Sequence, residues 1–272
     1  MDALPSPVPI ERLEVGLVLV PIRSPDGEPM AFILDTGAGI TVLTPSAAAR
    51  LGVSPGRTVD AQAIGGTVPV ALGTLDELRV GDAVLEDLDV AVLELPRAVV
   101  VQLGRPVDGV LGRSFFEQAD VTLDVGASAL TLHPPGSLAD EREGGVRFRL
   151  PGGVVEVRAD LGDARRLRAV LDLGANGSVV SRTTAKSTGG PIRPAVGGMQ
   201  GADGLPVPLL AEVRAPVRIG DTDLGPMRLG VCEDVQCTVL LGKQARKVHL
   251  GIDAVEGWTV ALSYRDRRLW LE

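Results

Sequence analysis

The sequence predicts an all-β protein that is built as two similar halves. Three observations lead to this prediction. Short runs rich in Val, Leu, Ile and Ala alternate with turn residues, stretches with helical periodicity are nearly absent, and blocks of the first half recur in order in the second half. The 34 glycines and 20 prolines among the 272 residues are scattered between the runs, as is typical of short strands joined by tight turns.

The elements of the first half follow from local patterns. Five apolar runs have about the length of β-strands: 17–22, 31–34, 75–80, 88–93 and 121–123. Asp26 and Gly27 lie between the first two runs, and this pair indicates a tight hairpin. Two short helices are expected, one at 45–51 with Ser46 as the candidate N-cap and one at 113–119.

The most linker-like segment divides the chain almost in half. It reads Pro-Pro-Gly-Ser-Leu-Ala-Asp-Glu-Arg-Glu-Gly-Gly over 134–145 and is polar and rich in turn formers. We therefore expect an N-terminal lobe at 1–135, a linker at 136–145 and a C-terminal lobe at 146–272.

Composition argues against several classes of function. The 35 acidic and 27 basic residues give a net charge of −8, and an acidic chain with 3% aromatic residues is poorly suited to nucleic acid. No apolar run approaches the roughly 20 residues that span a bilayer, and the first residues lack the basic and apolar regions of a signal peptide. We expect a soluble chain without a membrane segment, located in the cytoplasm unless a leader has been removed for export.

Cysteines and histidines are scarce, with two of each: Cys232, Cys237, His133 and His249. This leaves little material for a metal site, so we expect neither a metal nor another cofactor. We expect both cysteines to be reduced and partly buried, with a small disulfide loop as the alternative in an oxidising compartment.

An internal repeat is carried by four blocks. They pair 32–44 with 169–181, 78–82 with 217–221, 110–112 with 240–242, and 121–123 with 260–262. The separations are 137, 139, 130 and 139 residues, whereas chance similarity between Val- and Gly-rich strands would give scattered values. The repeat therefore predicts one lobe that has been made twice.

Each half carries Asp-x-Gly-Ala directly after an apolar run. The first copy is Leu34-Asp35-Thr36-Gly37-Ala38, and the second is Leu171-Asp172-Leu173-Gly174-Ala175. With Val110-Leu111-Gly112 downstream, this pattern resembles the catalytic loop and companion strand of aspartic proteases of the retropepsin-like group. The duplication resembles the bilobal pepsin arrangement, and the whole is most similar to bacterial aspartyl proteases with two such lobes. The resemblance covers almost the whole chain apart from the first dozen residues and the linker.

The resemblance implies two closed or partly closed β-barrel lobes, related by a pseudo-twofold axis, that bind an extended peptide between them. It also implies that Asp35 and Asp172 form the catalytic dyad of an aspartic endopeptidase. Hydrolysis without a metal or a covalent nucleophile requires one group to take a proton from water and another to protonate the carbonyl oxygen. Two facing carboxylates that share one proton perform both tasks, which is the established pattern of aspartic proteases.

The residues expected to support the dyad are Thr36, Gly37, Ala38, Leu173, Gly174 and Ala175. The two glycines allow a tight turn beneath each carboxylate. By resemblance, the Thr36 hydroxyl reaches across to the backbone of the partner loop. Leu173 stands at the equivalent place and has no hydroxyl, so half of this cross-lobe lock is expected to be missing, a loss of about 0.5–1.5 kcal/mol.

Flaps that close over the substrate are expected between the two motifs of each lobe, where glycine pairs would give a lid its mobility. The expected flap residues are Ile64, Gly65, Gly66, Gly197, Gly198 and Met199. An ordinary hairpin turn is the alternative interpretation.

Three other residues are of types that could act as catalytic groups. Asp124 also begins an Asp-x-Gly-Ala sequence, but the repeat places it opposite Ser263, so we interpret it as a turn aspartate. His133 and His249 would suit a serine triad, but the chain has no Gly-x-Ser-x-Gly elbow, and we interpret both as exposed or locally satisfied loop residues.

The sequence therefore predicts a monomeric aspartic endopeptidase that acts on a peptide or protein substrate in an extended conformation and requires no cofactor. Because Leu173 departs from the family pattern, the alternative is a catalytically inactive peptide-binding protein of the same fold. A third hypothesis, a duplicated β-barrel without a peptide cleft, requires both Asp-x-Gly-Ala loops to be coincidental turns.

Overall fold

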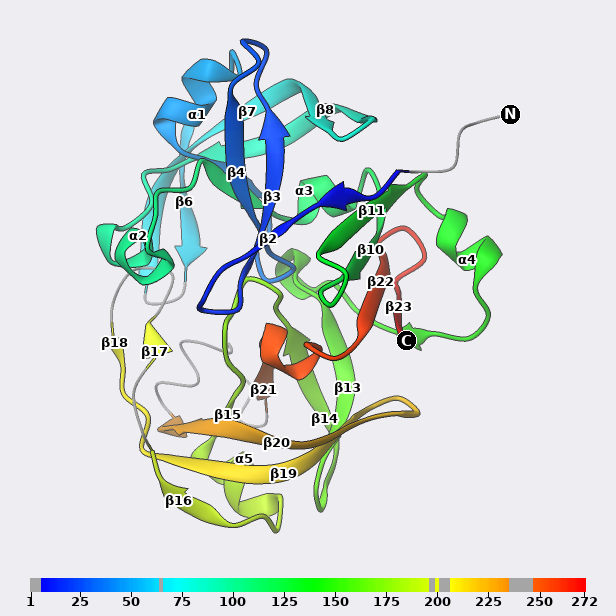
Figure 1. Cartoon of the computed structure of the whole chain (residues 1–272). Helices are drawn as coiled ribbons and strands as arrows, with labels where there is room; N and C mark the ends of the chain where they lie inside the picture. The colour runs from blue at the N-terminus through cyan, green and yellow to red at the C-terminus, as the bar shows by residue number, and fades with distance from the viewer. Residues whose placement is uncertain (1–5, 64–65, 196–198, 201–205, 235–246) are drawn as a thin grey trace.

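A computed structural model describes residues 6–63, 66–195, 199–200, 206–234 and 247–272. The chain folds as two β-rich lobes joined by a sheet to which both contribute (Figure 1). This arrangement confirms the predicted all-β, two-lobed fold class.

The first lobe contains an eight-stranded sheet in the order β2-β3-β4-β9-β5-β8-β7-β6. Its strands are β2 (Glu11–Arg12), β3 (Val18–Arg23), β4 (Pro29–Leu34), β5 (Thr41–Leu43), β6 (Thr58–Ala63), β7 (Gly66–Val80), β8 (Ala83–Val92) and β9 (Gly109–Leu111). The predicted hairpin is confirmed, because β3 and β4 pair antiparallel and Gly27 takes a φ of 84° in the turn between them.

The second lobe contains a seven-stranded sheet in the order β13-β14-β21-β15-β20-β19-β16. Its strands are β13 (Glu156–Leu161), β14 (Ala164–Leu171), β15 (Val179–Ser181), β16 (Ile192–Pro194), β19 (Ala211–Ile219), β20 (Thr222–Cys232) and β21 (Lys247–Leu250). An additional pairing of β13 with β19 closes this sheet into a barrel. A separate two-stranded pair is formed by β17 (Met199–Gln200) and β18 (Pro206–Val207).

The shared sheet has six strands in the order β1-β11-β10-β22-β23-β12. These are β1 (Val8–Pro9), β10 (Asp120–Asp124), β11 (Ala129–His133), β12 (Val146–Arg147), β22 (Thr259–Ser263) and β23 (Arg268–Leu271). Thr122 of β10 faces Ala261 of β22, which is its own counterpart in the repeat. The pseudo-twofold axis therefore passes between these two residues, and each lobe contributes three strands around it.

The helices are short: α1 (Pro45–Arg50), α2 (Arg97–Leu103), α3 (Arg113–Phe116), α4 (Ser137–Glu141), α5 (Arg182–Ser187), and the 3-10 turns η1 (Pro151–Gly153) and η2 (Ile252–Ala254). The N-cap of α1 is Thr44, whose hydroxyl accepts from the Ala47 N–H, so the expectation of Ser46 was wrong. Pro45 occupies the first helical position, so the cap lies at Thr44, two residues before Ser46. Ser181 caps α5 in the same way.

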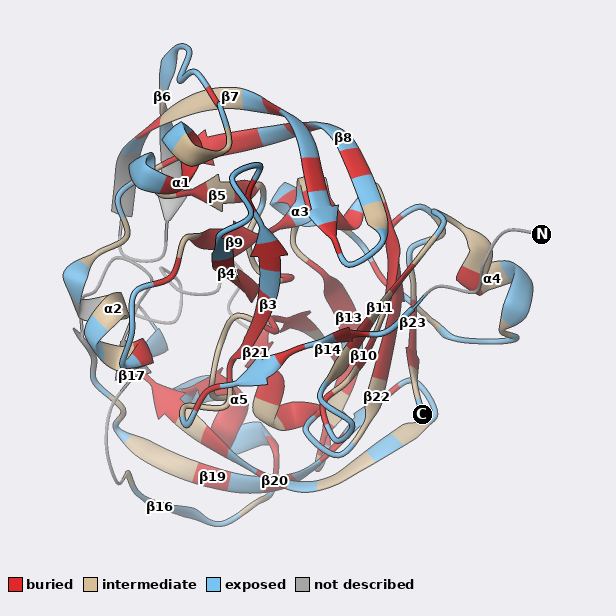
Figure 2. Cartoon of the chain, turned by 45° about the horizontal axis from the view of Figure 1, so that its top comes forward, coloured by how far each residue is buried: buried red, intermediate tan, exposed pale blue. Residues whose placement is uncertain are grey.

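One apolar core runs through both lobes and the shared sheet. Figure 2 shows that strands in the middle of the molecule, including β10 and β14, are mostly buried, whereas the outer strand β19 alternates between buried and exposed residues. An aromatic group joins the lobes, because the ring of Phe116 stacks on Tyr264 with centroids 5.0 Å apart, and Phe148 meets Tyr264 edge-on at 5.6 Å. On another part of the shared sheet, Leu138 of α4 packs with Ala261 and Trp270 in a small second cluster.

The expectation of two reduced cysteines was wrong. Cys232, which ends β20, is disulfide-bonded. The chain's other cysteine, Cys237, lies outside the described residues.

In the part of the chain that the structure describes, no helix is both long and apolar enough to cross a membrane.

Candidate active site

Each Asp-x-Gly-Ala loop follows the last residue of a central strand. Asp35 follows β4, and its backbone N–H donates to the carbonyl of Leu111 in β9 at 3.0 Å. Asp172 follows β14, and its N–H donates to the carbonyl of Leu250 in β21 at 2.8 Å. In both lobes the companion strand runs parallel to the strand that carries the aspartate, so the two aspartates occupy equivalent positions.

The companion strand of the second lobe is not the one that the repeat predicted. The companion strand is β21, which pairs parallel with β14 and antiparallel with β15. In the first lobe, β9 pairs with β4 and β5 in the same way. The segment 240–242, which was expected there, lies outside the described residues. The counterpart of 110–112 is therefore 249–251, at a separation of 139 residues that agrees with the other blocks.

The structure brings Asp35 and Asp172 together across the pseudo-twofold axis. Each carboxyl group shifts the pKa of the other, and each glycine of the motif lies against the aspartate of the other lobe. A Cβ on Gly37 would overlap the Asp172 carboxyl group, and a Cβ on Gly174 would overlap that of Asp35. Only glycine leaves room for the two carboxyl groups to meet.

Backbone donors hold each carboxylate from its own loop. The Gly37 N–H donates to Asp35 Oδ1 at 2.7 Å, and the Gly174 N–H donates to Asp172 Oδ1 at 2.8 Å. The loops are anchored by their alanines as well, because the Ala38 carbonyl accepts from the N–H of Arg113 and the Ala175 carbonyl from that of Ile252.

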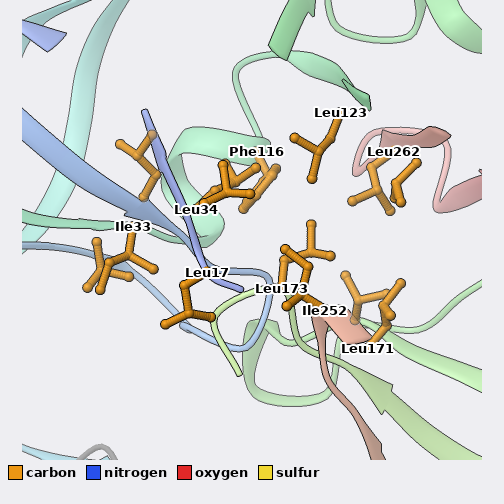
Figure 3. Packing of buried hydrophobic residues seen from close by; sticks show 14 of the residues in the cluster. Leu17, Ile33, Leu34, Phe116, Leu123, Leu171, Leu173, Ile252 and Leu262 are labelled. Carbon is orange, nitrogen blue, oxygen red and sulfur yellow. The ribbon is translucent and has the colours of Figure 1, made fainter. Parts of the chain in front are cut away.

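The expected cross-lobe contact of Thr36 is confirmed. Its buried hydroxyl donates to the Leu171 carbonyl at 2.7 Å and accepts from the Leu173 N–H at 3.0 Å. Leu173 contributes differently, since its fully buried side chain lies among apolar residues of both lobes that include Leu34 and Ile252 (Figure 3). The second loop therefore contributes apolar packing where the first contributes a hydrogen bond.

His249 lies beside the dyad, so its interpretation as a loop residue was wrong. It belongs to β21, and its Nε2 lies 2.9 Å from Asp172 Oδ2, with both side chains 9% exposed. Its counterpart in the first lobe is Val110. Aligning the repeat at a separation of 139 residues would have found His249, because that register places it two residues before the second companion glycine.

Behind the dyad, each lobe ties its companion glycine to the strand that follows the catalytic loop. The N–H of Gly251 donates to Ser178 Oγ at 3.1 Å, and this hydroxyl donates to Asp253 Oδ1 at 2.7 Å. In the first lobe, the N–H of Gly112 donates to Thr41 Oγ1 at 3.2 Å. These contacts fix the ends of β9 and β21 against the loops.

The surroundings displace the pKa values of the two aspartates in opposite directions. Burial, followed by the negative charge of Asp172, raises the pKa of Asp35 well above its ordinary value. Burial opposes the charge of Asp172 too. The hydrogen bond and charge of His249, together with the hydrogen bonds of Asp35 and the Gly174 N–H, outweigh it, so the pKa of Asp172 is lowered. The pair is therefore arranged to hold one proton, on Asp35.

The other candidate residues are placed as follows. Among the expected flap residues, Ile64, Gly65, Gly197 and Gly198 lie outside the described residues. Gly66 begins β7 and pairs with Ala63 of β6, and Met199 of β17 pairs with Val207 of β18. Both segments are thus hairpin strands, and their role as flaps stays a prediction.

The remaining alternatives lie away from the dyad. Asp124 Oδ1 accepts the Ala127 N–H at 2.7 Å in the turn after β10, which confirms its interpretation as a turn aspartate. His133 lies on β11, where its Nε2 is 3.0 Å from Thr122 Oγ1. Within the described ranges, no group of three or more His, Cys, Asp or Glu side chains is arranged to hold a metal ion.

The chain matches one family of proteins by sequence and many solved structures by fold. The sequence profile of the family described as "Aspartyl protease" matches residues 20–115 and 156–245, one segment in each lobe. The fold is similar to that of basic 7S globulin from soybean, with a TM-score of 0.57, 11% sequence identity, and coverage of 99% of this chain and 95% of the other. A search of curated protein sequences returns no match. At this identity the structural likeness concerns the fold alone.

Proposed function

Because the chain belongs to the aspartyl protease family, we propose that it is an aspartic endopeptidase whose dyad consists of Asp35 and Asp172. The observation that carries this proposal is the pairing of two carboxyl groups, one from each lobe, whose pKa values are displaced in opposite directions. Acid and base roles are separated in this way in sites that hydrolyse a bond with two carboxyl groups.

In the proposed mechanism, the Asp172 carboxylate takes a proton from water while Asp35 gives its proton to the scissile carbonyl oxygen. The water oxygen bonds to the carbonyl carbon, which becomes a tetrahedral diol. Transfer of a proton to the amide nitrogen then allows the C–N bond to break. The products are a carboxylic acid and an amine, and the dyad again holds one proton. Asp172 is buried, which strengthens its electrostatic contribution.

The test is cleavage of an unfolded protein or a mixed peptide library from about pH 3 to 8, the range in which a carboxyl pair can share a proton, with and without pepstatin. Asp35→Asn and Asp172→Asn are each expected to abolish cleavage. Asp124→Asn is the matched control, because it alters the third Asp-x-Gly-Ala sequence, whose aspartate serves a turn. It is expected to cleave like the wild type. Cleavage that survives Asp172→Asn but not Asp35→Asn would refute this dyad and favour a homodimer that pairs two first lobes.

The second candidate is a catalytically inactive protein that binds extended peptides. Leu173 favours it, because this residue replaces the hydroxyl that would complete the reciprocal contact of Thr36. A folded protein that binds library peptides but cleaves none at any pH would support this candidate over the endopeptidase.

A further inference from the structure

The dyad is built on two nearly equivalent backbones, yet its two carboxyl groups have different neighbours. Gly37 and Gly174 supply the same N–H contact to Asp35 and Asp172. Asp172 has an additional partner, His249, whose Nε2 lies 2.9 Å from Oδ2. Both oxygens of Asp172 therefore have a nitrogen within hydrogen-bonding distance. His249 is the side chain that distinguishes the surroundings of Asp172 from those of Asp35, whose companion residue is Val110.

The two lobes also differ in the row of side chains that runs across each sheet through the companion residue. Residues paired across neighbouring strands project to the same face, so each companion residue belongs to a row of side chains. In the first lobe this row consists of Leu19, Ile33, Val110 and Val42. In the second lobe it consists of Glu156, Val170, His249 and Val179. The first row is apolar throughout, whereas the second contains two ionisable side chains, both buried.

Resting on the proposed function, we propose that His249 is a positioning residue that makes the dyad asymmetric, by holding Asp172 as the ionised partner and leaving the shared proton on Asp35. An N–H donor held against a buried carboxylate oxygen favours the charged form of that carboxylate. Val110 has no polar side-chain atom and gives Asp35 no such preference. In a dyad without His249, neither aspartate would have this additional reason to be the base.

Other charged groups around His249 come from several elements. Asp253 of η2 interacts with His249 through its charge and is itself held by Ser178. Glu156 of β13 projects to the same face one strand beyond Val170 and lies 3.9 Å from the Arg168 guanidinium. Tyr264, at the end of the shared sheet, is buried, and the charges of both aspartates oppose its ionisation. Among these groups, His249 is the one whose side-chain nitrogen lies against a carboxyl group of the dyad.

The inference predicts the acid side of the pH profile. As pH falls, cleavage fails when Asp172 takes up a proton, and the His249 contact delays that step to lower pH. His249→Val installs the residue of the first lobe and removes the donor. We expect it to move the acid limb of kcat/KM to higher pH by about one to two units. His249→Leu, which also lacks a donor, serves if the valine variant fails to fold. His249→Gln keeps an N–H donor and is expected to fall between these variants and the wild type.

The matched control is His133→Val, which removes the chain's other histidine from β11, where its partner is Thr122. It is expected to leave the acid limb in place. An acid limb that stays at the wild-type pH in both His249→Val and His249→Leu overturns the inference.

A second readout does not depend on cleavage. In protein labelled with 13C at the aspartate carboxyl carbons, the signal that is missing from Asp172→Asn identifies Asp172, and its titration is followed by NMR. Its midpoint is expected to rise in His249→Val and to stay unchanged in His133→Val. An unchanged midpoint in both donor-free variants refutes the role of His249. Absence of cleavage in a wild type whose Asp172 midpoint depends on His249 refutes the proposed endopeptidase instead.

Discussion

Replacing Thr36 by valine tests the contact that ties the two catalytic loops together. The Thr36 hydroxyl donates to the Leu171 carbonyl at 2.7 Å and accepts from the Leu173 N–H at 3.0 Å, and both partners belong to the other lobe. Valine keeps the shape of the side chain but leaves a buried carbonyl and a buried N–H without this partner. At about 1–3 kcal/mol for each group, the free energy of unfolding is expected to fall by about 2–6 kcal/mol.

Thr188→Val is the matched control. The buried Thr188 hydroxyl also makes one bond of each kind, donating to the Ala185 carbonyl at 2.8 Å and accepting from the Gly190 N–H at 3.2 Å. All of its partners lie in its own lobe, so the same free-energy loss is expected without displacement of the dyad. Only Thr36→Val is expected to lower kcat/KM of the folded protein, by about 100-fold if a carboxyl group moves by 1 Å.

Urea unfolding followed by tryptophan fluorescence gives the free energies, and peptide cleavage in the absence of urea gives kcat/KM. The reasoning is refuted if Thr36→Val loses less than about 0.5 kcal/mol, the lower limit for one hydrogen bond. It is also refuted if the folded Thr36→Val and Thr188→Val proteins have the same kcat/KM, because the contact would then stabilise the fold without positioning the dyad.

Four further predictions concern the dyad and its loops. Because the pKa of Asp35 is raised above 3.8, ionising this group destabilises the fold at neutral pH. Asp35→Asn should therefore raise Tm at pH 7, and the gain should disappear below about pH 3.8. An unchanged Tm at pH 7 contradicts this. The pKa of Asp172 is lowered, so Asp172→Asn should lower Tm at pH 7 and the loss should shrink as pH falls below 3.8. Gly174→Ala should abolish peptide cleavage, because the added Cβ overlaps the Asp35 carboxyl group. Gly177→Ala, whose Cβ meets nothing within 4 Å, should leave cleavage intact. Equal rates of cleavage in the two variants would exclude the steric explanation. Leu173→Thr should lower the free energy of unfolding by about 2–4 kcal/mol in urea titrations, since it removes buried methyl groups, and a more stable variant would show that the added hydroxyl matters more than packing.

Sequence patterns correctly indicated those features that depend on neighbours along the chain. The hairpin at Gly27 and the turn at Asp124 follow from the preferences of a few adjacent residues. The motifs at Asp35 and Asp172 stood out because an apolar strand followed by Asp-x-Gly-Ala occurs at matching places in both halves. The repeat predicted that these aspartates are equivalent, and the shared sheet places the pseudo-twofold axis between the lobes.

Only the tertiary structure decided which residues surround the dyad. The expected companion pattern, an apolar pair followed by glycine, occurs at 240–242, whereas histidine replaces the first apolar residue at the true position, 249–251, so the pattern indicated the wrong segment. Strand pairing settles the choice, because β21 inserts between β14 and β15, far from either in the sequence. The same pairing brings His249 to Asp172, 77 residues earlier in the chain. Local composition determines where the chain turns and extends, but the ionisation of a buried carboxyl group depends on side chains that only long-range pairing brings near it.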